Sequence, residues 1–176
     1  MKTFKKLAYI LFFLLSFNSF GQNIKKDTTN VKLISAAKEI MIAAGTCALV
    51  SLDKEGGARV RTMDPFKPEN NLTVWLGTNS KSRKVNQIKN SEKVTLYYLD
   101  SDDSSYVIIY GTAQLVNDKT QLEKRWKEKW KDFYPNKTEN YLLIKITPIW
   151  MEISSTSRGI FGDTKTWQPP RVWFNN

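Results

Sequence analysis

The chain contains no histidine and a single cysteine among its 176 residues. Without histidine, a Ser-His-Asp or Cys-His hydrolase is excluded, as is zinc or haem held by an imidazole ligand. One cysteine cannot make an intramolecular disulfide, nor a zinc or iron–sulfur site built from several thiolates. Cys47 lies in an apolar run that predicts a strand, so we interpret it as a buried, inert thiol. An enzyme of this composition would take its chemistry from an organic cofactor.

Long apolar runs are scarce, and the clearest is Leu7–Phe17, close to the N-terminus. It follows three lysines and precedes a small-x-small sequence at residues 19–21, the pattern of a secretory signal peptide. A transmembrane helix needs about 20 apolar residues, so an uncleaved membrane-anchoring segment is the weaker alternative. We therefore predict a signal peptide at residues 1–21 and a flexible leader at residues 22–30. The mature protein is then exported, periplasmic or secreted, with no stable membrane anchor after cleavage.

Negative charge is also scarce, with 17 acidic residues against 27 lysines and arginines and a formal net charge of +10. Loss of the three signal-peptide lysines leaves +7. This excess fits an anionic partner, although solubility alone accounts for many such charges. Export argues against nucleic acid. The acidic cluster Asp100–Asp103 lacks the spacing of a calcium loop, so we interpret it as a solvated hairpin turn and predict no metal site.

Runs of β-branched and apolar residues predict a mainly β, α+β domain over residues 31–155. The six predicted strands are Thr46–Leu52, Ala58–Asp64, Leu72–Gly77, Lys93–Leu99, Tyr106–Val116 and Tyr141–Ile153. The predicted amphipathic helices are Val31–Ala44, Ser82–Asn90 and Lys119–Phe133. Close hairpins with few crossover helices favour an antiparallel barrel that carries its helices outside. The C-terminal tail, residues 156–176, is too aromatic for a disordered segment, so we expect it to lie against other structure.

The segment Leu72–Ile88 is the most informative motif. A strand stops at Gly77-Thr78, a polar basic turn follows, and a helix begins. The turn gathers hydroxyls and cations, namely Thr78, Ser80, Lys81, Ser82, Arg83 and Lys84. A helix N-terminus adds free N–H groups and partial positive charge, which together suit a phosphate dianion. A basic surface loop after an edge strand has the same local features, so these residues alone leave both interpretations open.

With neighbouring segments, this motif resembles a known family, the FMN-binding split barrels related to pyridoxamine 5′-phosphate oxidase and the general-stress flavoproteins. The similarity is most specific in Trp75–Asn79 and Ser82–Lys84, and it extends to the hairpin segment Gly56–Met63 and to Val107–Ala113. It spans about Val31–Ile153. The resemblance implies a six-stranded antiparallel split β-barrel with flanking helices, an FMN cofactor and a homodimer.

The resemblance also implies roles for individual residues. Arg61, Ser82, Arg83 and Lys84 would hold the FMN phosphate and ribityl chain. The main chain near Thr62, Met63, Gly77 and Thr78 would flank the isoalloxazine. Tyr106 stands where the oxidases have a cofactor-binding glutamine, and Trp167, with Trp126 and Trp130, is a candidate to cover the flavin from a second subunit. For Trp126 and Trp130, packing on their own barrel is the favoured alternative.

The chain departs from the oxidases at its C-terminus, where it lacks the Arg- and His-containing segment that grips pyridoxal phosphate. This departure favours the general-stress branch. The expected function is an FMN-binding flavoprotein, an oxidoreductase with an unknown small-molecule substrate or electron donor and no assignable catalytic residue. The alternative is a non-catalytic exported ligand-binding or stress-related protein on the same barrel, holding haem, deazaflavin or another anionic planar ligand. A third interpretation is a basic anion-binding module without a cofactor.

Overall fold

The computed structural model describes residues 29–100 and 105–174. The predicted signal peptide, most of the leader and most of the acidic turn lie outside the described residues, and export stays a prediction. Among the helices that are described, none has the length and apolar character needed to cross a bilayer.

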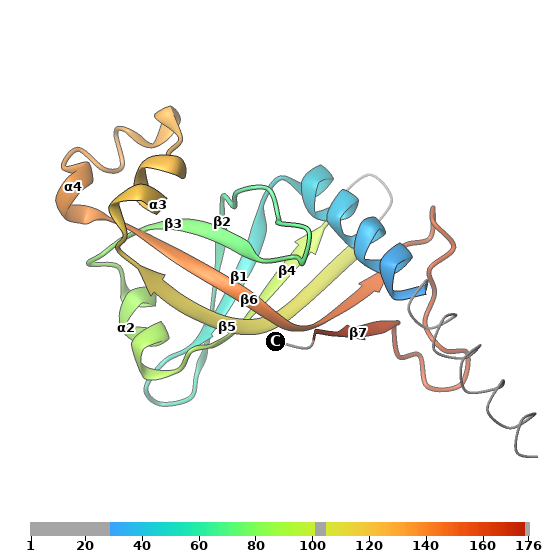
Figure 1. The fold of residues 1–176 in the computed structure, drawn as a ribbon. Helices are drawn as coiled ribbons and strands as arrows, with labels where there is room; N and C mark the ends of the chain where they lie inside the picture. The colour runs from blue at the N-terminus through green and yellow to red at the C-terminus, as the bar shows by residue number, and fades with distance from the viewer. Residues whose placement is uncertain (1–28, 101–104, 175–176) are drawn as a thin grey trace, which may run out of the picture.

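Seven antiparallel strands form one sheet in the order β2-β1-β4-β5-β6-β3, with β7 paired to β6 (Figure 1). They are β1 (Cys47–Leu52), β2 (Ala58–Met63), β3 (Val74–Asn79), β4 (Lys93–Leu99), β5 (Tyr106–Val116), β6 (Tyr141–Ser154) and β7 (Arg171–Trp173). The six predicted strands are confirmed, with small differences at their ends. The terminal strands β2 and β3 are joined only by an isolated bridge, between Pro65 and Leu76, so the sheet stays open as in a split barrel.

The inward-facing residues of alternating strands form the main core. In β1, for example, Cys47, Leu49 and Ser51 are buried while the residues between them are partly exposed, as a period of two requires. A helix over residues 29–44 covers one end of the barrel (Figure 1) and adds Ala37 and Ile40 to the core. This helix ends at Ala44, as predicted, and Gly45 follows it in the left-handed conformation that favours glycine (φ +66°).

The predicted helix Lys119–Phe133 is wrong as a continuous element. Helix α3 (Lys119–Lys124) ends at Arg125, and a 3₁₀ turn, η1 (Glu128–Trp130), follows. Lys127, between them, has extended backbone angles. The reason is tertiary: Arg125 stacks over Trp75, 3.7 Å from the ring centroid, and Lys127 pairs with Asp64. These contacts need side-chain directions that one straight helix cannot provide. A short helix, α4 (Lys137–Asn140), then leads into β6.

The C-terminal tail lies against the barrel, as predicted, and contributes a strand that the sequence did not indicate. Strand β7 pairs with Trp150, Met151 and Glu152 of β6, and Val172 is buried in the main core. At three residues, β7 is too short to show a hydrophobic period.

Candidate functional site

Helix α2 (Arg83–Asn90) begins where β3 ends, and its N-terminus forms one end of the candidate site. Ser82 is the N-cap residue, but its hydroxyl makes no capping bond to the helix backbone. No acidic side chain occupies the first turn. The partial positive charge of the helix end is therefore not offset locally, which favours an external anion.

Lys84 places its ammonium group at this helix end. Its Nζ donates to Oγ of Ser82 (2.7 Å) and to Oγ1 of Thr78 (3.2 Å). Burial lowers the pKa of Lys84 from its ordinary value, and the nearby charge of Arg61 lowers it further. Both effects disfavour the cation, so a bound anion would relieve them.

Arg61 stands beside this group but is held by the protein. Its guanidinium donates to Oγ of Ser51 (2.7 Å), to the carbonyl of Leu49 (3.3 Å) and to Oε1 of Gln87 (2.7 Å). This network ties β2 to β1 and to α2. It fixes the positive charge of Arg61 close enough to Lys84 to affect its pKa.

The three cations crowd together without acidic partners. Burial, and after it the charge of Arg83, lower the pKa of Arg61. None of Arg61, Arg83 and Lys84 forms an ion pair within the described part of the chain. Such a cluster is suited to a multivalent anion, because each cation is stabilised by the same negative charge.

A cleft of about 550 Å³ joins this cationic end to an aromatic wall. That volume falls within the range of small-molecule sites. The cleft is lined by Thr62, Met63, Asp64, Gly77, Thr78, Asn79, Ser82, Lys84, Lys129, Trp130, Phe133 and Tyr134. It lies where the two terminal strands of the open sheet, β2 and β3, face each other.

The aromatic wall comes from residues 125–134, here called the aromatic arm. Asp64, directly after β2, holds it: the carboxylate accepts from Lys127 (2.6 Å), Lys129 (2.8 Å) and Nε1 of Trp130 (3.0 Å). Burial alone would raise the pKa of Asp64, but hydrogen bonds from Lys127 and Lys129 outweigh it, and the pKa is lowered. Asp64 is therefore ionised near neutral pH and serves as the anchor of the arm.

The arm also packs on its own barrel, which confirms the favoured placement of Trp126 and Trp130. Both tryptophans contact Tyr141 edge-on or tilted, with ring centroids 5.2 Å and 6.1 Å away. Tyr134 completes this cluster at 5.1 Å from Tyr141. Trp130 thus covers the cleft from the same chain.

The structure brings six of the ten predicted site residues into the cleft: Thr62, Met63, Gly77, Thr78, Ser82 and Lys84. Arg61 and Arg83 lie next to it without lining it. Tyr106 and Trp167 line a different cavity of about 480 Å³, beneath the tail, together with Phe161 and Pro169.

Sequence reasoning missed Asp64, Asn79, Lys129, Phe133 and Tyr134. Asn79 ends the recognised motif and could have been included. The others depend on how the aromatic arm folds back across β2 and β3, and local spacing carries no signal for that.

Several comparisons bear on this arrangement. The family model described as "Pyridoxamine 5'-phosphate oxidase like" matches residues 29–160. A solved structure from Clostridium acetobutylicum, related to general stress protein 26, is 18% identical, with 82% of this chain and 95% of that chain covered and a TM-score of 0.65. General stress protein 26 from Bacillus anthracis is 21% identical, with 81% and 98% covered and the same TM-score.

A third structure, from Nostoc punctiforme, is described as a pyridoxamine 5′-phosphate oxidase-related, FMN-binding protein. It is 14% identical, covers 83% of this chain and 95% of its own, and has a TM-score of 0.57. At these identities the likeness shows a shared fold. A search of curated proteins found no match.

The aromatic arm packs closely against Gly77, so a substitution at this position can test that contact. A Cβ at this position would lie 2.5 Å from Cζ3 of Trp130 and 2.9 Å from Cε2 of Tyr141. We expect Gly77→Ala to displace Trp130, weaken its bond to Asp64 and lower the free energy of unfolding by about 1–3 kcal/mol. Near-UV circular dichroism and hydrogen exchange of residues 125–134 would report the movement. In a Trp130→Leu background the same substitution should cost less, because only the close approach to Tyr141 remains; an equal cost there would contradict the assignment.

Proposed function

We propose that this chain, which belongs to the pyridoxamine 5′-phosphate oxidase-like family, binds FMN in the cleft between β2 and β3. The observation that carries the proposal is that Lys84, which forms no ion pair in the described part of the chain, lines the same cavity as an aromatic wall. A phosphorylated planar molecule matches both ends. The description of the Nostoc punctiforme neighbour as FMN-binding supports the same ligand.

The residues present fit such a ligand by their donor chemistry. Lys84, with the hydroxyls of Thr78 and Ser82, would hold the phosphate at the α2 N-terminus, and Arg61 and Arg83 would add attraction from beside it. Each hydrogen bond to a charged group contributes about 1.5–3 kcal/mol, so a few of them supply much of the roughly 8 kcal/mol of micromolar binding. Met63, Gly77 and Trp130 are placed to contact the ring system.

We further propose that the bound protein is an oxidoreductase. FMN supplies hydride or electron transfer when bound, and the protein supplies binding, orientation and exclusion of water. Among the described cleft residues, the carboxylate is that of Asp64, which is engaged by three donors. The scheme therefore assigns no protein base, and the aromatic arm would exclude water from the ring.

The phosphate role of Lys84 separates FMN from riboflavin. We expect Lys84→Met to weaken FMN binding about 10- to 100-fold, because a charge-assisted bond is lost, and riboflavin binding less than threefold. Flavin fluorescence quenching would measure both affinities. Lys81→Met is the matched control, since Lys81 is exposed on the same turn and does not line the cleft.

If Lys84→Met weakened FMN binding and riboflavin binding equally, Lys84 would have no role in binding the phosphate. A colourless protein without affinity for flavin would favour the ligand-carrier alternative. Bleaching of the flavin by a nicotinamide donor without oxygen tests the oxidoreductase proposal. Stable yellow colour with every donor tried would argue against it.

The depressed pKa of Lys84 predicts a pH effect in the flavin-free protein. Because the folded-state pKa lies below the unfolded value of about 10.4, the unfolded chain binds more protons between these two values, and stability rises with pH there. We expect the wild type to gain stability relative to Lys84→Met between neutral pH and about pH 10, by up to about 1 kcal/mol for a half-exposed group. Urea denaturation at both pH values measures this; a pH-independent difference would refute it.

We also propose that the protein is a homodimer that completes the site. The outer face of the sheet carries one continuous row of cross-strand neighbours from β2 to β7, namely Val60, Val50, Thr95, Tyr110, Trp150 and Trp173. Val60 and Trp173 are 64% and 61% exposed, so an apolar and aromatic surface faces outward. Thr62 of the cleft and Tyr106 of the tail cavity lie on this same face. A second copy seated there would bring its Tyr106 and Trp167 toward the cleft.

Light scattering after size exclusion tests the dimer. We expect twice the chain mass for the wild type, and a shift toward the monomer for Val60→Asp, since an unpaired charge buried at the interface costs about 3–5 kcal/mol. Lys54→Asp, in the exposed β1–β2 turn, is a control that should leave the mass unchanged. A monomeric wild type at high concentration would overturn the proposal.

A further inference from the structure

The tail cavity, of about 480 Å³, is separate from the cleft, and none of its wall residues lines the cleft. It forms where the first residue of β5 and the last residue of β6 meet the loop 155–170, which joins β6 to β7 at the right of Figure 1. Its volume falls within the range of small-molecule sites. Three aromatic residues, Tyr106, Phe161 and Trp167, line it beside Pro169. The wall therefore offers aromatic surface to a ligand.

Two of these aromatic side chains are largely exposed. Trp167 is 84% exposed and Phe161 is 61% exposed. Neither ring packs against another aromatic ring in the part of the chain that the structure describes. This differs from the aromatic arm, whose rings contact one another. The rings of the tail cavity therefore keep surface that a ligand can cover.

The turn that carries Trp167 holds it in a strained conformation. Its φ of +60° lies in the left-handed region, which a bulky residue rarely adopts. The N–H of Trp167 donates to the carbonyl of Asp163 (2.8 Å), and the N–H of Asp163 donates to the carbonyl of Gln168 (2.9 Å). A Cβ at Gly162 would lie 2.9 Å from the carbonyl oxygen of Trp167, so the turn needs glycine there. Backbone strain that the surrounding bonds maintain is frequent at ligand-binding sites.

The wall also carries a carboxylate that the protein leaves without a counter-ion. Oδ1 of Asp163 accepts from the backbone N–H groups of Thr166 (2.8 Å) and Lys165 (3.0 Å), and these bonds lower the pKa of Asp163. The group is therefore ionised at neutral pH and fixed in position. It forms no ion pair with any described residue. Of the described residues that line the cavity, none is a lysine or an arginine.

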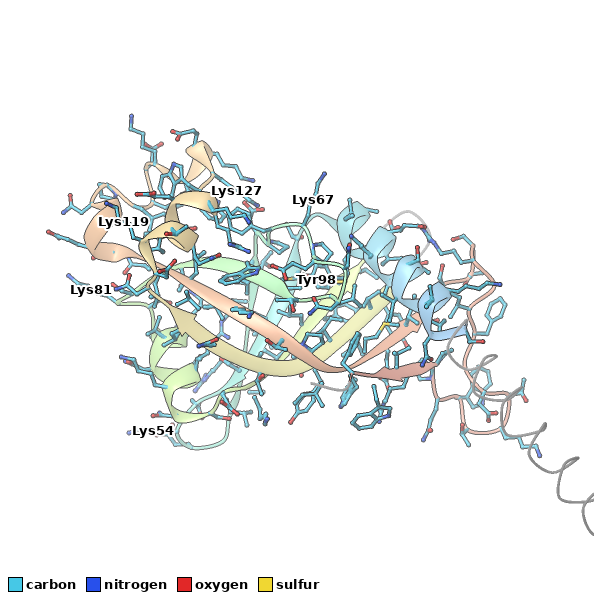
Figure 2. The ribbon with its side chains drawn as sticks, viewed as in Figure 1. Lys54, Lys67, Lys81, Tyr98, Lys119 and Lys127 are labelled. Carbon is cyan, nitrogen blue, oxygen red and sulfur yellow. The ribbon has the colours of Figure 1, made fainter. Side chains whose placement is uncertain are left out.

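The excess positive charge of the chain does not neutralise this carboxylate. Arg158 pairs with Glu39 (3.5 Å), and Nε of Arg171 donates to Glu152 (3.0 Å). Lys165 belongs to the turn but does not line the cavity. Figure 2 shows other lysines at the left of the molecule, far from the loop 155–170, namely Lys54, Lys81 and Lys119. At physiological salt, charges at such distances are largely screened.

Elsewhere the chain covers its aromatic rings with its own cations. Arg125 lies 3.7 Å from the ring centroid of Trp75, and Arg171 lies 4.4 Å from that of Trp150. Ring faces attract cations because their π electrons carry partial negative charge. Among the described residues, no lysine or arginine lies over the rings of the tail cavity, which are those of Tyr106, Phe161 and Trp167. These rings are available to a cation from outside the chain.

We propose that the tail cavity binds a small organic cation with a quaternary ammonium head, beside the rings of Trp167 and Phe161 and the carboxylate of Asp163. The methyl groups of such a head match the apolar rings, and its charge matches the ring faces and the carboxylate. A metal ion fits less well, because one carboxylate supplies few of the oxygen ligands that such ions need. All the wall residues come from one chain. The site therefore requires neither FMN nor a second copy.

Choline is the test ligand, and 3,3-dimethyl-1-butanol, which has carbon in place of the nitrogen, is its uncharged counterpart. We expect choline to bind the purified flavin-free protein by calorimetry with a dissociation constant near or below about 1 mM. The alcohol should bind at least about fivefold more weakly, because it keeps the shape and loses the charge. Equal affinity for the two compounds, or no binding at about 10 mM choline, would overturn the proposal.

Two substitutions test the location. Trp167→Leu should weaken choline binding about three- to thirtyfold, the range for a lost cation–π contact. Asp163→Asn should weaken it about two- to fivefold, since the charge is lost while the amide oxygen still accepts the bonds of the turn. Trp173→Leu is the matched control, because Trp173 is also exposed (61%) but lies outside the cavity. Choline affinity that both Trp167→Leu and Asp163→Asn leave unchanged would refute the site.

The competing occupant is a second copy of the chain. Val60→Asp, the variant expected to favour the monomer, should bind choline as tightly as the wild type does, because the wall is complete in one chain. Binding by this variant but not by the wild type would mean that the partner subunit fills the cavity, and would overturn the proposal. Failure of FMN to bind would leave this result unaffected, since the cleft and the tail cavity share no wall residue.

Discussion

Strands β2 and β3, the two ends of the sheet order, are not paired as strands, and the architecture of the site follows from that open seam. Unpaired strand edges expose N–H and C=O groups that must be covered or used. Here the aromatic arm crosses the seam, and Asp64 holds it there through Lys127, Lys129 and Trp130. A closed barrel would have filled this space with ladder hydrogen bonds. The open one leaves a cavity with backbone on two sides and aromatic rings on a third.

The cationic end of the cleft is positioned by the same fold. The guanidinium of Arg61 donates hydrogen bonds to Ser51, Leu49 and Gln87. These bonds fix the position of its charge beside the cleft. Lys84 is oriented by Thr78 and Ser82. These bonds hold like charges close together; burial lowers the pKa of Lys84, and the nearby charge of Arg61 lowers it further. The phosphate of the proposed ligand would then bind to groups whose positions need little rearrangement.

The sequence predicted what local periodicity encodes. Alternation predicted the six long strands, and the change from strand to basic turn to helix predicted the helix start where Ser82 and Lys84 line the cleft. It could not predict the break at Arg125, because cation–π stacking over Trp75 is a contact across many residues of chain. The sequence also gave no signal for the contacts of Asp64 with the aromatic arm or for the place of Tyr134 in the cleft, because both depend on contacts between distant parts of the chain. The resemblance predicted Tyr106 and Trp167 as cofactor-binding residues. Within a single chain, however, they line the tail cavity and not the cleft.

The lack of histidine has a consequence at the site itself. The ionisable side chains that line the cleft include lysines and Asp64, whose pKa is lowered, so no imidazole changes the charge of the cleft between pH 5 and 8. With FMN bound as proposed, the titrating group in that range would be the phosphate of the ligand, since the second pKa of a phosphomonoester is near 6. A fixed cluster of cations stabilises the dianion over the monoanion and draws that pKa downward. Affinity for a phosphomonoester should therefore be set by the ligand's own ionisation, with the protein acting as a constant positive field.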